Sequence, residues 1–189
     1  VIVEVIDDSD AAFYIAKTAM LGGKHVVSAS KKMIAEHLPE LLQLQQQTGQ
    51  SFLYEASACA SIPVIRNLEE YYDNDLLHSI QAIVNGSTNY ILTKMFEEKL
   101  SYRDALLQAQ QLGFAESNPK LDVEGYDAVN KWNNLLAHAY GIVTSPDKIL
   151  FTGIQTVQGF DAQVAEEKHW VIRLVAQAKK LASGKVAAF

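Results

Sequence analysis

The sequence has 189 residues, of which 49% are hydrophobic and 20% charged, enough for one medium domain or for one domain with part of another. Its formal net charge of −6 argues against a nucleic-acid partner, because a phosphate-binding surface needs clustered lysines and arginines. The longest apolar runs, such as 62–65 and 80–84, are too short to cross a bilayer, so we expect no membrane association. No signal-peptide pattern is visible and Cys59 is the single cysteine, which favours a cytoplasmic location.

The first third of the sequence alternates between short apolar runs and helical patterns. Strands are predicted at 1–6, 24–28 and 51–55, and helices at 11–21 and 35–47. This order is typical of βαβ units with parallel strands. We therefore predict an α/β fold that begins with a partial Rossmann-like parallel sheet.

The second part reads as α+β. Helices are predicted at 65–72, 90–98, 101–112 and 125–141, a strand at 77–85, β-like chain from Phe151 and a helical period over 164–182. Gly113 is a natural stop for the third of these helices, and residues 184–189 read as a turn and the start of a strand. We predict two domains: residues 1–62, the C-terminal part of a nucleotide-binding domain, and residues 63–189, a catalytic and dimerisation domain. The chain opens and closes on strands, so we expect both domains to be incomplete.

Lys131 lies in the predicted helix 125–141, four residues after Asp127, so the two share a helical face. For an arbitrary pair at this spacing, a surface salt bridge is the commoner outcome. The loop just upstream, however, adds Glu116 and Asp122. Three carboxylates near one lysine would suit a zwitterionic substrate, with carboxylates for an ammonium group and the lysine as proton donor to a developing alkoxide.

Two other segments could carry chemistry. Lys31 follows the second predicted strand, at the edge where open α/β sheets bind ligands, although solvated lysines are commoner in general. The turn 85–89 leads into a helix, and Ser87 or Thr88 is expected to cap it; the alternative places ligand atoms against its backbone N–H groups. The histidines show no pair at metal-ligand spacing, and no G-x-G-x-x-G fingerprint is present.

Four segments resemble homoserine dehydrogenases, in the same order. Residues 23–31 resemble that family's G-K-H-V-V-T-A-N-K, and residues 54–65 are similar to E-A-x-V-x-x-G-I-P-I-I. Residues 85–95 look like N-G-T-T-N-Y-I-L-T-K-M almost letter for letter, and residues 110–131 resemble A-x-x-L-G-Y-A-E-x-D-P-x-x-D-V-x-G-x-D-A-x-x-K. The four segments span most of the chain, and the last two are highly specific.

The resemblance implies an NAD(P)-dependent enzyme that reversibly reduces L-aspartate 4-semialdehyde to L-homoserine, on the route to threonine, methionine and isoleucine. It implies that Lys131 is the proton donor, with Asp122 and Lys31 completing the catalytic set. It places the amino-acid end of the substrate at Glu116 and Asp127. It also implies that the following residues contact NADP or NAD: Ser9, Ser28, Ala29, Lys31 and Gly113.

The family also has a sodium site formed largely by backbone carbonyls, here implied at Glu55, Ala58, Ala60 and Ile62. The family's Val and Gly-Gly are replaced by Ala58 and by Ala60-Ser61, and loss of glycine restricts the backbone. Ser30 and Asn118 are smaller departures that leave the catalytic set intact.

Two alternatives stay open. One is another Rossmann oxidoreductase of the sugar-dehydrogenase type, and the other is a truncated, non-catalytic assembly or regulatory module. We expect a homodimer formed through the second domain, and weak NADPH binding by this chain alone, because the phosphate-binding loop is absent from it.

Overall fold

The computed structural model describes residues 1–72 and 76–189 and forms two compact units. Unit 1 comprises Val1–Ile80, Asn130–Ile149 and Ala178–Ala188, and unit 2 comprises Gln81–Val129, Leu150–Gln177 and Phe189. The chain therefore passes between the units more than once. The domain boundary after residue 62 stays a prediction.

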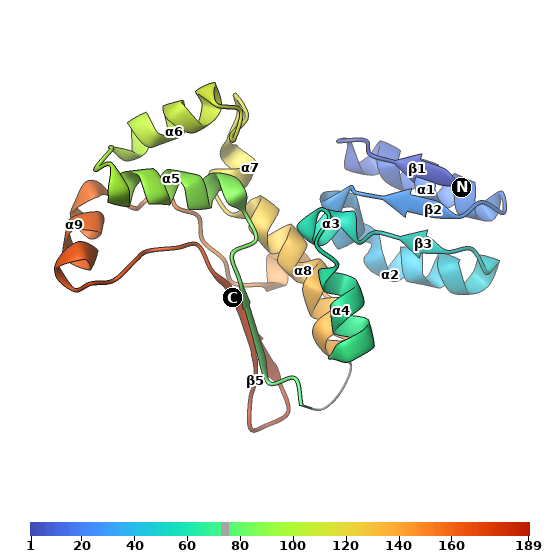
Figure 1. The fold of residues 1–189 in the computed structure, drawn as a ribbon. Helices are drawn as coiled ribbons and strands as arrows, with labels where there is room; N and C mark the ends of the chain where they lie inside the picture. The colour runs from blue at the N-terminus through green and yellow to red at the C-terminus, as the bar shows by residue number, and fades with distance from the viewer. Residues whose placement is uncertain (73–75) are drawn as a thin grey trace. The chain divides into compact units, whose positions relative to one another are not determined.

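The predicted parallel sheet is present in unit 1. It consists of β1 (Ile2–Glu4), β2 (Val26–Ser28) and β3 (Phe52–Leu53), in that order, with Ile2 paired to Val26 and Val26 to Phe52 (Figure 1). Helices α1 (Ser9–Leu21) and α2 (Lys31–Thr48) form the crossovers, and the Phe13 and His37 rings stack between them at 4.0 Å. This arrangement confirms the α/β class.

Helix α2 begins four residues earlier than predicted and continues through Pro39. A proline has no backbone N–H, so Pro39 leaves the carbonyl of Ala35 without its helical donor. The side chain of Asn133, on α8 (Tyr126–Tyr140), donates from Nδ2 to the Ala35 oxygen at 3.3 Å and to the Thr144 oxygen at 3.1 Å. A buried asparagine on one helix thus compensates for the proline in another.

Two short helices, α3 (Ala56–Cys59) and α4 (Val64–Tyr71), follow β3. Later in the chain, a 3-10 helix at Pro146–Lys148 follows α8. A second sheet has the order β4 (Ser79–Ala82), β5 (Ala176–Lys180), β6 (Val186–Ala188). Strands β5 and β6 are antiparallel, with Ala178 paired to Ala188, and the strand expected at the end of the chain is β6.

The helical period predicted over 164–182 is wrong. Helix α9 (Gly159–Glu167) ends early and residues 176–180 form β5, where Ala176 and Ala178 are buried at alternate positions. Alanine and lysine favour helices, but pairing with β6 outweighs that preference. Residues 151–157, expected to be β-like, contain no strand.

Unit 2 is built around α5 (Gly86–Glu97) and α6 (Tyr102–Gln111), whose apolar faces bury Ile91, Leu92 and Met95 against Ala105 and Ala109. The Ser101 side chain caps α6 by accepting from the Asp104 N–H at 3.1 Å, and Gly113 follows at φ 76°, as predicted. The cap expected for α5 is wrong. Asn85 caps this helix, because the helix begins at Gly86, before Ser87 and Thr88.

A close backbone approach fixes the segment between α7 (Lys120–Val123) and α8. The Ile154 N–H donates to the Val123 oxygen at 2.8 Å, and Gly125 has a φ of 90°. A Cβ at Gly125 would lie 2.6 Å from the Thr152 oxygen, so glycine is required there both by space and by backbone angle. This contact holds the chain between Asp122 and Asp127 in place.

Across the two described ranges, no helix is both long and apolar enough to span a membrane.

Candidate functional site

A buried amide in unit 2 joins two of the predicted site carboxylates. Asn85 Nδ2 donates to Asp122 Oδ1 at 2.7 Å and to Asp127 Oδ2 at 2.9 Å. The two carboxylates come from α7 and from the first turn of α8, and Asp127 is only 5% exposed. Asp127 is therefore a buried side chain and not a solvent-exposed one. A buried and a half-buried carboxylate that share one neutral donor form a site suited to a cationic group.

Glu116 lies outside this hydrogen-bond network. Its side chain is exposed in the loop after α6, and its backbone oxygen accepts from Gln110 Nε2 at 2.9 Å. The predicted role of Glu116 in substrate binding stays a prediction.

Unit 1 carries the two predicted lysines. Lys31 begins α2 directly after β2, and Asn134 Nδ2 of α8 donates to its backbone oxygen at 3.4 Å. Lys131 and Asn134 are three residues apart on α8, so they share the helix face that meets the start of α2. Both lysine side chains are half-buried. The helix packing therefore brings Lys31 and Lys131 to the same end of the parallel sheet.

The predicted cofactor contacts lie beside a buried glutamate. Glu4, at the end of β1, is 1% exposed and accepts hydrogen bonds from the Ser28 hydroxyl at 2.5 Å and from the Ser30 hydroxyl at 2.9 Å. The Ser9 hydroxyl donates to Glu36 at 2.5 Å. The Ser9 and Ser28 hydroxyls already donate hydrogen bonds to carboxylates within the protein. A cofactor at this position would therefore bind the backbone of Ser28 and Ala29 more readily than the serine hydroxyls.

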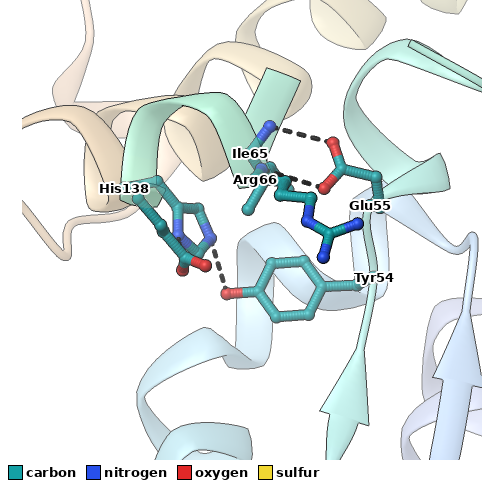
Figure 2. A network of polar contacts seen from close by, with 6 residues as sticks. Tyr54, Glu55, Ile65, Arg66 and His138 are labelled. Carbon is teal, nitrogen blue, oxygen red and sulfur yellow. Dashed lines mark hydrogen bonds and ion pairs between the residues drawn. The ribbon is translucent and has the colours of Figure 1, made fainter. Parts of the chain in front are cut away.

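The segment after β3 contains the residues implied for sodium. The Glu55 carboxylate binds the N-terminus of α4, because it accepts hydrogen bonds from the backbone N–H groups of Ile65 at 2.9 Å and Arg66 at 3.0 Å (Figure 2). The Ile62 N–H donates to the Cys59 oxygen at 3.0 Å, which closes a tight turn with Ala60 at φ 52° and ψ −115°. These are the angles of the first central residue of a type II′ turn, a position that glycine normally occupies. Ala60 therefore adopts a backbone conformation that usually requires glycine.

We predict that Ala60→Gly stabilises the whole protein. Glycine adopts the Ala60 backbone angles without steric cost, so the free energy of unfolding should rise by about 1 kcal/mol. Urea unfolding would measure the change. Ala58→Gly is the matched control, because Ala58 is helical and the same substitution there should lower stability; equal losses in both variants would contradict the prediction.

A buried tyrosine links this segment to α8. The Tyr54 hydroxyl lies 2.8 Å from His138 Nε2 (Figure 2). On the other side of the ring, His138 Nδ1 lies 2.7 Å from Glu69 Oε1. Burial, assisted by the Glu69 charge, raises the pKa of Tyr54 well above its usual value, so the phenol keeps its proton and is able to donate to Nε2. The imidazole thus links the Tyr54 hydroxyl to the Glu69 carboxylate.

Lys131 also lies near the end of α3. Burial raises the pKa of the Cys59 thiol, the positive charge of Lys131 opposes that shift, and Glu55 adds to it. Within the described residues, no cluster of three or more histidine, cysteine or acidic side chains could hold a metal ion.

The sequence reasoning did not single out Asn85, Glu4 or His138. Asn85 carried a usable signal, because an asparagine between a strand and a helix start is a preferred N-cap. The hydrogen bonds of Asn85 to Asp122 and Asp127 span 37 and 42 residues and have no local signal. His138 likewise finds Tyr54 84 residues away.

Comparison with known proteins assigns the family. The family model described as homoserine dehydrogenase matches residues 63–188. The chain belongs to the homoserine dehydrogenase family. It is 38% identical over 180 residues to the homoserine dehydrogenase of Helicobacter pylori, covering 95% of this chain and 42% of that protein. With the Lactococcus lactis enzyme the identity is 37% over 174 residues, covering 92% and 40%.

Solved homoserine dehydrogenases share the fold. The enzyme from Thiobacillus denitrificans matches with a TM-score of 0.93 and 32% identity over 99% of this chain and 44% of that one. A hyperthermophilic archaeal homoserine dehydrogenase mutant, solved in complex with NADPH, matches with a TM-score of 0.78 and 33% identity over 99% and 54%. The chain spans less than half the length of the curated relatives that it matches. Neither alternative to a homoserine dehydrogenase is favoured by these matches.

Proposed function

We propose that the whole protein containing this chain is a homoserine dehydrogenase, which reversibly reduces L-aspartate 4-semialdehyde to L-homoserine with NADPH or NADH. The observation that carries the proposal is the pair formed by half-buried Asp122 and buried Asp127, held by Asn85 within a chain of this family. A carboxylate pair that is largely shielded from water matches the ammonium group of an amino-acid substrate.

Each residue has a role in this proposal. Asp127 and Glu116 bind the amino-acid end of the substrate, and Asp122 orients the site. Lys131 donates a proton to the aldehyde oxygen as that oxygen gains negative charge, and it takes the proton back in the reverse reaction. When bound, the dihydronicotinamide supplies the hydride that the carbonyl carbon accepts.

The carboxyl edge of the parallel sheet would hold the nicotinamide end of the cofactor. Lys31 and the backbone of Ser28 and Ala29 lie at this edge, which is where ligands bind in open α/β sheets. Ser9, at the start of α1, and Gly113 complete the proposed cofactor contacts. Gly113 has open space where a Cβ would point, so a ligand could approach its backbone. The NADPH complex of the archaeal relative supports a nicotinamide cofactor, NADP or NAD.

Sodium binding, a homodimer and a cytoplasmic location are further parts of the proposal. Sodium would bind the backbone oxygens of Glu55, Ala58, Ala60 and Ile62. The turn at Ala60 supports this fit, because Ala60 adopts the backbone angles that glycine usually takes in such a turn. Cys59 as the single cysteine fits a reducing compartment.

The test is turnover by the purified whole protein. We expect L-homoserine to drive the formation of reduced nicotinamide, followed by its near-ultraviolet absorbance, in the presence of NADP⁺ or NAD⁺. L-serine, which is one carbon shorter, is the matched control and should react much more slowly. No turnover of L-homoserine with either cofactor would refute the proposed function.

A further inference from the structure

The amide of Asn85 uses all of its hydrogen-bonding capacity in one arrangement. Its Oδ1 accepts from the Thr88 N–H at 2.8 Å and from the Thr88 hydroxyl at 2.9 Å. Its Nδ2 donates both hydrogens, to Asp122 and to Asp127. Rotating the amide by half a turn would place its oxygen against two carboxylates and its NH₂ group against an N–H donor. Thr88 therefore fixes which end of Asn85 faces the acids.

This arrangement does more than cap a helix. An N-cap needs only a side-chain oxygen that accepts from the N–H of N3, and serine or threonine supplies one as well as asparagine does. Only the amide NH₂ group can at the same time donate to two carboxylates. Asn85 is 4% exposed and Thr88 is fully buried, so water cannot readily replace these donors.

The three acidic and amide side chains come from separate elements of unit 2. Asn85 precedes α5, Asp122 lies in α7, and Asp127 lies in the first turn of α8. Two carboxylates that lie close together repel each other, and a shared donor offsets that repulsion. The amide, which donates to both, therefore favours the spacing that they have here.

We propose that Asn85 is a positioning residue for substrate binding, which holds Asp122 and Asp127 together so that their oxygens converge on the ammonium group of the substrate. The proposal rests on the homoserine dehydrogenase function proposed above. Asn85 itself does not contact the reacting atoms.

Asn85→Ser in the whole protein separates the two roles, because serine keeps the cap and removes both donors. Loss of hydrogen bonds to charged groups should raise the KM for L-homoserine by about 10- to 150-fold. The KM for the nicotinamide cofactor should stay within about twofold of the original value, since the changed contacts lie at the substrate end. Asn85→Thr, which also caps, provides the same measurement if the serine variant does not fold.

Ser101→Ala is the matched control. It removes the cap of α6, in the same unit, and a hydroxyl that contacts Asp104 but neither Asp122 nor Asp127, so it should lower the melting temperature and leave the KM for L-homoserine unchanged. An Asn85→Ser protein with the original KM for L-homoserine would overturn the positioning role and leave the proposed function intact. No turnover by the unmodified protein would overturn the proposed function and this inference together.

Discussion

Replacing Lys131 by alanine is expected to lower the kcat of the whole protein by at least about 100-fold, because a positioned general acid–base group contributes this much or more. The KM for L-homoserine should change much less, since the proposed ammonium contacts belong to the carboxylates. Steady-state kinetics in both directions would measure the effect. Partial recovery of kcat by added small primary amines would identify the lost group as a proton donor.

Two further lysine variants serve as controls for Lys131→Ala. Lys120→Ala removes an exposed lysine from α7 and should leave kcat within about twofold of the original. Lys31→Ala tests the other lysine at the same end of the sheet, where a rise in the cofactor KM is expected. A nearly normal kcat in the Lys131 variant, with a lost kcat in the Lys31 variant, would assign the proton transfer to Lys31 instead.

The second large effect concerns Gly153 and the stability of unit 2. A Cβ at this position would lie 2.0 Å from the Val123 oxygen and 2.5 Å from the Glu124 Cα, both of them backbone atoms that cannot swing aside. Gly153→Ala should therefore push away the chain between Asp122 and Asp127 and cost about 3 kcal/mol or more. Thermal unfolding would show the loss as a lower melting temperature. In any folded fraction, the KM for L-homoserine should rise.

Gly159→Ala is the matched control for this substitution. Gly159 is the first residue of α9, and a Cβ there meets nothing within 4 Å. Alanine at this position should be neutral or stabilising by up to about 1 kcal/mol, because it restricts the unfolded chain. Equal melting temperatures for the two variants would contradict the prediction, because they would show that residues 123–125 and 152–154 can move apart at little cost in stability.

Local patterns were sufficient for the parallel half of the fold. Strands β1 to β3 are short apolar runs separated by helices of ordinary length, and such a helical crossover is the usual connection between parallel strands. The prediction failed where pairing is long-range. Strand β5 is rich in alanine and lysine, and its conformation depends on β6 and on the alternate burial of Ala176 and Ala178.

In the candidate site, too, local features could be predicted from the sequence and long-range contacts could not. The position of Lys31 at a strand end and the helical spacing of Asp127 and Lys131 are local properties, and the sequence is sufficient to predict them. The meeting of Asp122 and Asp127 at one amide is not local, because Asn85 reaches them across about a fifth of the chain. The same holds for Glu4, whose buried carboxylate binds serines on the neighbouring strand and after it.

The contact between Asn133 and the Ala35 carbonyl couples the evolution of α8 to that of α2. A protein with an ordinary residue at position 39 supplies its own N–H to that carbonyl, and an apolar residue at position 133 then packs without leaving an acceptor unsatisfied. If proline at position 39 is combined with an apolar residue at position 133, the buried Ala35 oxygen has no donor. If a non-proline residue at position 39 is combined with Asn133, the buried Asn133 amide loses one of its acceptors. Related sequences should therefore change these two positions together, and a chimera that takes α2 from one relative and α8 from another should lose stability unless the pair is exchanged as a unit.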